Sequence, residues 1–530
     1  MSLDKDLLSI QEARNLASQA KQAQLEYKHF SQEQVDKVVK AMVDAGYNEA
    51  ERLAKMAYEE TGFGKVSDKI IKNQFGTRDV WNSIKDLKTV GVIEVRSNGK
   101  ILKIAEPMGI VAALVPSTNP TSTAMFKAII SLKCRNGIVV SPHPKAVNCT
   151  KEALKVVTEA AEKAGAPKGL IQCLSIPTLE GTDALMHDKN IAVILATGGM
   201  PMVRAAYSSG KPAYGVGAGN VPAFIEKSAN IEKAVADIVF GTTFDNGVLC
   251  SSEQAIVVDR AISEKVKEAA KKKGCYFVNA DEKKKLEDKI AKGAKLNAEI
   301  VGKSAVWIAN YAGFSVPETT TVLIAECEVV GKKEPLSIEK LSPVLAYYTV
   351  DGWMDGCHKC IELLEFGGIG HTLAIHSNDK DIIMKFALEK PAFRIVVNTP
   401  SSVGAVGYST DLMPSMTLGP GTWGGSIISE NVSAMHLMNV KTLAFESRVI
   451  NQGNSLTSLE GYSAVSNAKT GYSEGSFTKQ IEERLRARAG NPNIEFGKTE
   501  AQAKPESKHA EFGSGISETE IKKIMKEFSK

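Results

Sequence analysis

The sequence predicts an α/β protein with two doubly wound domains, each built on a parallel sheet, plus a β-arm for oligomerisation. From Gly109 onward, short apolar runs alternate with helical stretches, and a second alternating region begins after Cys250. Runs that are apolar on both faces are typical of parallel sheets covered by helices. A third observation, Asn98-Gly99 between two alternating runs, predicts a hairpin. A chain of 530 residues is long enough for two or three domains.

Composition excludes several function classes. The net charge of +4 is small for this length, so we expect neither a nucleic-acid partner nor a membrane surface. No apolar run is long enough for a transmembrane helix, and the first residues lack the pattern of a signal peptide. The eight scattered cysteines are typical of a reducing compartment. We therefore expect a cytoplasmic protein.

One cysteine pair has metal-ligand spacing. Cys357 and Cys360 form a C-x-x-C pattern, but no second ligand pair follows at a matching distance. A helix that carries two cysteines is the favoured interpretation, and we expect no metal.

The first third of the chain predicts helices, then a hairpin, then a sheet. Residues 3–28 show an approximate helical stripe, and a capping box at Ser31–Gln34 starts a strongly amphipathic helix. Residues 92–104 form the predicted hairpin, whose exposed edges would be suited to pairing with another strand. The expected strands of the first sheet are 110–115, 138–141, 171–174 and 191–195, with helices at 124–133 and 151–164 between them.

Parallel sheets of this kind bind ligands at the carboxyl ends of their strands. Polar turns rich in Gly and Pro fall there in this sequence. They are Val115–Ser122, Ser141–Lys145, Leu195–Pro201 and Tyr214–Asn220.

Cys250 is the candidate nucleophile. It lies between an Asp-Asn-Gly turn at 245–247 and an apolar, β-branched run at 254–258 that predicts a buried strand. A thiol there would be held rigidly and could still be reached by a substrate. The reactive form of a thiol is the thiolate, and no adjacent Lys, Arg or His is present in the sequence to favour it. On these residues alone, a buried small hydrophobe remains the alternative.

The segment from Phe244 to Gln254 resembles the catalytic-cysteine segment of the aldehyde dehydrogenase superfamily. The likeness is greatest to its coenzyme A-acylating branch, which includes the propionaldehyde and acetaldehyde dehydrogenases of bacterial microcompartments. It runs from about Gln32 to about Glu446. The resemblance implies a homo-oligomer, a dimer or tetramer, in which the hairpin and a strand within 432–444 form the arm.

The resemblance also implies roles for individual residues. Asn119 matches the asparagine whose amide stabilises the oxyanion formed on the aldehyde. Glu339 matches the glutamate that holds the nicotinamide ribose. Ser141 and His143 stand where hydrolytic relatives carry a Lys-Pro turn at the adenosine ribose, which leaves NAD versus NADP open. Other matching positions are Thr197, Gly198 and Gly217 near the dinucleotide, and His371 and Thr422 near the substrate.

One departure bears on the reaction. Hydrolytic aldehyde dehydrogenases carry a Glu within the segment that matches Tyr214–Asn220, and it activates the water that cleaves the acyl-enzyme. This segment contains no base. Without a general base, hydrolysis is disfavoured and a thiol such as coenzyme A becomes the acyl acceptor.

The end of the chain predicts a linker and a short helix. Residues 500–514 have linker composition, and Ser517–Glu520 is a capping box. Ile521, Ile524, Met525 and Phe528 then fall on one helical face. This tail resembles the encapsulation peptides that bind enzymes to microcompartment shell proteins, with packing against its own oligomer as the alternative.

The sequence thus predicts an NAD-dependent, coenzyme A-acylating dehydrogenase of propionaldehyde or acetaldehyde, inside a microcompartment. The alternatives are a hydrolytic aldehyde dehydrogenase and a cysteine acyltransferase or scaffold without redox function. The expected division is a dinucleotide-binding domain (1–88 and 106–240), an arm (89–105 and 430–450), a catalytic cysteine domain (241–429), an extension with linker (451–515) and the tail helix (516–530).

Overall fold

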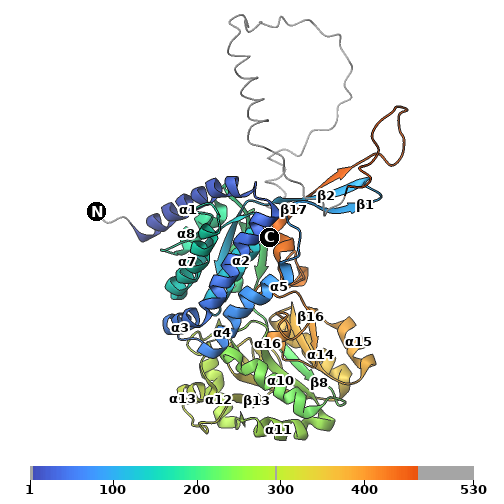
Figure 1. The fold of residues 1–530 in the computed structure, drawn as a ribbon. Helices are drawn as coiled ribbons and strands as arrows, with labels where there is room; N and C mark the ends of the chain where they lie inside the picture. Colours follow the sequence, from blue (N-terminus) through green and yellow to red (C-terminus); the bar gives the residue numbers. More distant parts are fainter. Residues whose placement is uncertain (1–3, 293–294, 463–530) are drawn as a thin grey trace, which may run out of the picture. The chain divides into compact units, whose positions relative to one another are not determined.

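The computed structural model describes residues 4–292 and 295–462 (Figure 1). The predicted linker and the tail helix at 516–530 lie outside the described residues. Within them, no helix is both long and apolar enough to cross a membrane.

Helices fill the chain before the first strand, as predicted. Ser31 caps the second helix: its hydroxyl accepts from the Gln34 backbone N–H, and the Gln34 side chain accepts in return, which completes the predicted capping box. The elements are α1 (Lys5–Tyr27), α2 (Gln32–Asn48), α3 (Ala50–Thr61), α4 (Val66–Gln74), the π-helical turn η1 (Phe75–Asp79) and α5 (Val80–Ile84).

The first sheet of the described chain has five parallel strands in the order β5-β4-β3-β6-β7. The chain runs outward from β3 in one direction and then returns to β6 on the other side of β3, so the order reverses between β3 and β6. Such a switch point opens a crevice at the carboxyl ends of the two strands. The strands are β3 (Ile110–Val115), β4 (Gly137–Pro142), β5 (Ile171–Cys173), β6 (Ile191–Thr197) and β7 (Ala213–Val216).

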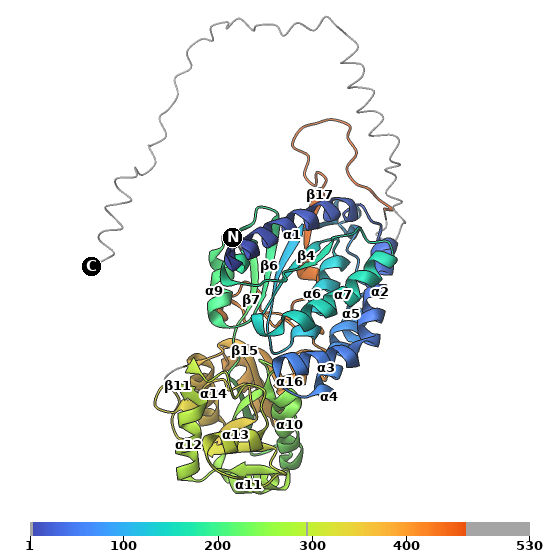
Figure 2. The ribbon, with the colours of Figure 1, turned by 90° about the vertical axis from the view of Figure 1, so that its left-hand side faces the viewer.

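Helices cover both faces of this sheet (Figure 2). The helices that follow the strands are α6 (Pro120–Lys133), α7 (Val147–Lys163), α8 (Leu179–His187) and α9 (Met200–Ser208). Alternate residues of β3 belong to two separate apolar cores. One core is shared with α2, α6 and α7, and the other with α1, α8 and α9. This two-sided burial explains why the strands are apolar throughout.

A second parallel sheet of seven strands, again counted within the described residues, has the order β10-β13-β14-β9-β8-β15-β16. Its strands are β8 (Val221–Ile225), β9 (Glu253–Asp259), β10 (Cys275–Phe277), β13 (Val322–Glu326), β14 (Val344–Val350), β15 (Gly370–His376) and β16 (Ala392–Val397). Its helices are α10 (Ile231–Thr243), α11 (Ser263–Lys272), α12 (Ala280–Ile290), α13 (Ala305–Ala312), α14 (Gly352–Phe366), α15 (Lys380–Glu389) and α16 (Ser401–Gly404), with a small β11 (Ala291–Lys292) and β12 (Lys295–Leu296) pair. Cys357 and Cys360 are buried in α14, in the helix expected for them.

The predicted boundary between the two α/β domains was wrong by one strand and one helix. Residues 221–240 were assigned to the first domain, yet β8 pairs with β9 and β15 of the second sheet. Sheet membership depends on pairing between distant strands, which local periodicity does not show. The crossing between the sheets is therefore the short segment 217–220.

The predicted hairpin is confirmed and carries a third strand (Figure 1). β1 (Gly91–Arg96) and β2 (Ile101–Pro107) are antiparallel, and Ser97, Asn98 and Gly99 all have positive φ in the turn. β17 (Met438–Ala444) pairs with the other edge of β2 in the same chain. Residues 434–437, at the start of the predicted strand segment, form a 3-10 turn instead.

Candidate active site

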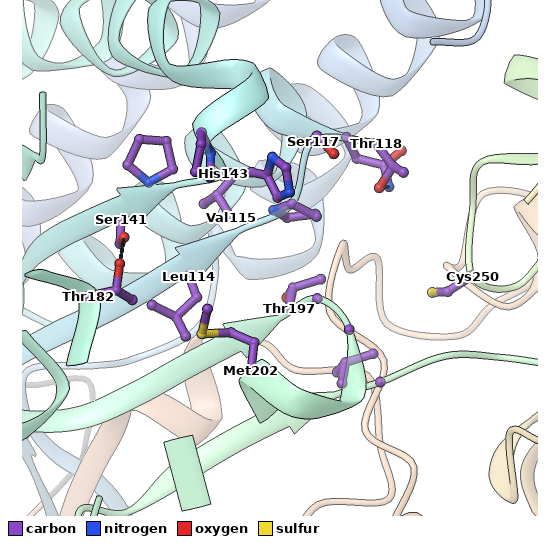
Figure 3. Close-up of a pocket in the computed structure, with 18 of the residues that line it drawn as sticks. Leu114, Val115, Ser117, Thr118, Ser141, His143, Thr182, Thr197, Met202 and Cys250 are labelled. Carbon is purple, nitrogen blue, oxygen red and sulfur yellow. Dashed lines mark hydrogen bonds between the residues drawn. The ribbon is translucent and has the colours of Figure 1, made fainter. Parts of the chain in front are cut away.

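A cavity of about 330 Å³ lies where the carboxyl ends of the first sheet meet the amino ends of the second. This volume is within the range of small-molecule sites. The cavity brings together all but two of the predicted site residues. Those that line it are Asn119, Ser141, His143, Thr197, Gly198, Gly217, Cys250 and Glu339. Figure 3 shows Cys250 across from the polar ends of β3 and β6.

Cys250 stands between the 3-10 turn η3 (Phe244–Gly247) and β9, as expected. Asp245 and Asn246 both have positive φ in that turn, which their short polar side chains tolerate. Burial, together with the nearby Glu339, raises the pKa of the Cys250 thiol to about 12, and Arg394 acts in the opposite direction. Cys250 is therefore a neutral thiol at neutral pH in this structure, and attack requires a change that favours the thiolate.

Asn119 occupies the N-cap position of α6, but within the described chain its side chain makes no capping bond. Instead the amide oxygen accepts from Lys72 Nζ at 2.6 Å, and the amide nitrogen donates to Thr118 Oγ1 at 3.1 Å. One N–H of the amide has no bond to another described residue, so Asn119 can donate into the cavity.

Glu339 puts a carboxylate against the crossing segment. It precedes β14, and its Oε1 accepts from the backbone N–H of Gly219 at 2.9 Å. Burial raises its pKa to about 7, while the Gly219 bond and Lys340 oppose that rise. Of the described residues that line the cavity, Glu339 is the one carboxylate. The segment 214–220 contains no base, as the sequence shows, yet a titratable acid from another segment contacts it.

Four of the residues predicted near the dinucleotide lie at or just after the carboxyl ends of β4 and β6: Ser141, His143, Thr197 and Gly198. Ser141 Oγ is 2.8 Å from Thr182 Oγ1, and His143 Nδ1 accepts from the Lys145 N–H. A Cβ built on Gly198 would meet no described atom within 4 Å, so this glycine faces open space before α9. Backbone N–H groups at a helix start suit the phosphates of a dinucleotide.

His371 and Thr422 do not line the cavity. His371 is buried behind the crossing segment: a Cβ on Gly219 would lie 3.0 Å from His371 Nδ1 and 2.1 Å from the Cys250 carbonyl oxygen. Thr422 lines a separate depression with Tyr207 and Ile427. Thr422 therefore lies outside this cavity, and its assignment to a substrate pocket stays a prediction.

Three charged residues near the site were not predicted as site residues. Arg394 is buried in β16, where its Nε donates to Thr372 Oγ1 and its Nη1 donates to the Ser429 carbonyl. The sequence signal that could have identified Arg394 as a site residue is the presence of an arginine within an apolar strand. Lys72 and Asp245 form a buried ion pair below Asn119. The helix of Lys72 and the turn of Asp245 gave no sign of this contact.

Comparison with known proteins fits this geometry. The family model described as the aldehyde dehydrogenase family matches residues 7–407. The chain is 48% identical over 441 residues to the bifunctional aldehyde-alcohol dehydrogenase AdhE of Escherichia coli (strain K12). The matched region covers 82% of this chain but 50% of that relative. The chain thus spans about half the length of the curated relatives that it matches first.

Solved structures give a match over their whole length. An acetylating aldehyde dehydrogenase from Geobacillus thermoglucosidasius is 51% identical, with a TM-score of 0.84 over 85% of this chain and 100% of its own. A propionaldehyde dehydrogenase from the fucose utilisation bacterial microcompartment of Clostridium phytofermentans is 30% identical, with a TM-score of 0.75 over 83% and 99% of the two chains. The chain belongs to the aldehyde dehydrogenase family.

Proposed function

We propose that the protein oxidises a short-chain aldehyde to its acyl-coenzyme A with reduction of NAD. The observation that carries this proposal is one cavity in which the Cys250 thiol, the Asn119 amide and the switch point of a doubly wound sheet meet. The names of the acetylating and propionaldehyde relatives support the substrate class.

Each residue has a part in the proposed reaction. The Cys250 thiolate adds to the aldehyde carbonyl carbon, and the oxyanion that forms accepts hydrogen bonds from the Asn119 amide and the Cys250 backbone N–H. A bound NAD would supply the hydride acceptor, and we assign Glu339 to its ribose. Loss of hydride leaves a thioester on Cys250. The coenzyme A thiolate then attacks this thioester, which releases acyl-coenzyme A and the Cys250 thiolate.

Acyl transfer is favoured over hydrolysis because no base lies in the segment 214–220. Among the described residues that line the cavity, Glu339 is the carboxylate with a pKa near 7, suited to take a proton from water in a hydrolytic enzyme. The bond from Gly219 to Glu339, and the match of Glu339 to the glutamate that holds the nicotinamide ribose in the family, favour a role in cofactor binding instead.

We propose NAD rather than NADP as the natural cofactor.

The test is NADH formation from propionaldehyde or acetaldehyde with NAD, with and without coenzyme A, for the wild type and Cys250→Ala. Sustained turnover only with coenzyme A, abolished by Cys250→Ala, is expected. Equal turnover without coenzyme A would establish the hydrolytic enzyme. Absence of NADH under every condition would leave an acyltransferase or scaffold, because a shared fold does not fix function.

We also propose a homo-oligomer and a microcompartment location. The exposed edges of β1 and β17 are suited to pairing with a second copy. The likeness to a microcompartment enzyme supports the tail at 516–530 as a shell-protein ligand. Light scattering checks the first proposal. Co-purification of a fluorescent protein fused to residues 516–530 with shell proteins checks the second, and a fusion with Ile524→Asp is its control.

A further inference from the structure

We propose that Lys72 is a positioning residue that fixes the orientation of the Asn119 carboxamide, with Asp245 holding the Lys72 ammonium in place. This inference rests on the proposed function and deepens it. It assigns a residue of α4, outside the lining of the cavity, to the construction of the oxyanion site.

The contact itself decides which way the amide faces. Lys72 Nζ lies 2.6 Å from Asn119 Oδ1, and an ammonium can only donate. The oxygen of the amide must therefore point at Lys72, and the nitrogen must point away from it. Since oxyanion stabilisation needs a donor, an amide turned the other way would present the wrong atom to the substrate.

Asp245 explains why the ammonium stays at this place. The carboxylate is fully buried, contacts Lys72 Nζ and accepts from Lys69 Nζ at 3.0 Å and from the Lys65 backbone N–H at 2.6 Å. Gly64 permits this packing, because a Cβ there would lie 1.9 Å from Asp245 Oδ1. Removing the partner of a buried charge is costly, so the pair is held firmly.

The charge of Lys72 depends on pH in a useful range. Burial, helped by the nearby charge of Lys69, lowers its pKa to about 8 against the opposing effect of Asp245 and Asp68. Lys72 is thus charged at neutral pH and loses its proton in mildly alkaline solution, where a neutral amine no longer imposes the same orientation on the amide.

Lys69 provides a matched control. It lies one turn earlier on α4, is also buried, and contacts the same Asp245 oxygen, but Lys72 and not Lys69 donates a hydrogen bond to the Asn119 side chain. Lys72→Met and Lys69→Met therefore remove the same kind of charge from the same carboxylate, and the Asn119 contact is lost in the first variant alone.

The experiment measures acyl-coenzyme A formation for Lys72→Met, Lys69→Met, Asn119→Ala and the double variant Lys72→Met/Asn119→Ala. We expect kcat to fall roughly 100-fold in Lys72→Met, as for the loss of one oxyanion donor, with a much smaller loss in Lys69→Met. The double variant should lose little beyond Asn119→Ala, because both changes remove one function. Equal losses in the two lysine variants, or additive losses in the double variant, would overturn the inference.

Lys72→Arg keeps the test decisive if the methionine variant does not fold. We expect wild-type kcat to decline above pH 8 as Lys72 loses its proton, and we expect this decline to be absent in Lys72→Arg, because arginine stays charged far above pH 8. An unchanged alkaline decline contradicts the inference. Failure of the proposed function is distinguishable, because the wild type itself would then form no acyl-coenzyme A through Cys250.

Discussion

The Glu339 carboxylate accepts a hydrogen bond of 2.9 Å from the backbone N–H of Gly219, and this bond ties the loop before β14 to the crossing between the two sheets. Gly219 in turn contacts the Cys250 backbone. The bond thus joins a carboxylate that lines the cavity to a backbone group 120 positions away in the sequence.

Ionisation of Glu339 should control cofactor binding. Its pKa near 7 means that the carboxylate, the better acceptor for ribose hydroxyls, forms between pH 6 and 8. We expect kcat/KM for NAD to rise over this interval in the wild type. In Glu339→Gln it should be flat and roughly tenfold lower, the difference between a charged and a neutral hydrogen bond. Glu318→Gln, an exposed change, is the control. An unaltered pH profile in Glu339→Gln would remove Glu339 from the cofactor site.

Cys250 should react slowly with iodoacetamide at neutral pH in the protein without cofactor. Because its thiol pKa is raised to about 12, the alkylation rate should rise about tenfold per pH unit from 7 to 10 without a plateau. Arg394→Met should slow the reaction, since Arg394 lowers this pKa. Arg260→Met, at an exposed ion pair, should not. Mass spectrometry gives the rates, and a plateau near pH 7 would reveal an activating group that this structure does not show.

Gly219 should tolerate no side chain. In Gly219→Ala the new methyl group would lie 2.1 Å from the Cys250 carbonyl oxygen, so the backbone must move. We expect a lower Tm and loss of activity. Gly198→Ala meets no described atom within 4 Å and should keep the wild-type Tm while raising the KM for NAD. Equal Tm values for both variants would contradict the described packing.

Stability should depend on the ionisation of Glu253, which is buried at the start of β9. Burial raises its pKa to about 8 from the ordinary 4.5 of an unfolded chain. Between these two values the folded state holds a proton that the unfolded state has lost, so the free energy of unfolding falls as pH rises from 4.5 to 8. Glu253→Gln still presents an amide oxygen to the Ser401 N–H and should lack this fall. Urea titrations at pH 5 and pH 8 measure the difference, and a parallel fall in the variant would contradict it.

Local patterns predicted the fold well. Asn98-Gly99 predicted the hairpin, and the apolar runs predicted β3 to β6, because each of these signals is carried by residues only a few positions apart in the sequence. The cavity residues were predicted by their resemblance to a family, since turns at strand ends look alike in every α/β protein.

Contacts between distant residues could not be predicted in this way. Lys72 looks like a solvated residue on an amphipathic helix, and Asp245 like an ordinary turn residue, although their charged groups meet across 173 positions. β8 was placed in the wrong sheet for the same reason. That Thr422 lies outside the cavity was not visible either, because a Gly-rich loop has no periodicity that fixes its path.

The Lys72–Asp245 pair has a consequence for chimeric enzymes. Lys72 belongs to the domain of the five-stranded sheet and Asp245 to that of the seven-stranded sheet. A recombination that joins these two domains from different parents inherits each charge separately. A chimera of this first domain with a second domain that lacks Asp245 would therefore bury the Lys69 and Lys72 ammonium groups without their carboxylate. Exchange of the second domain is restricted by this one residue, even where the reacting groups themselves are identical.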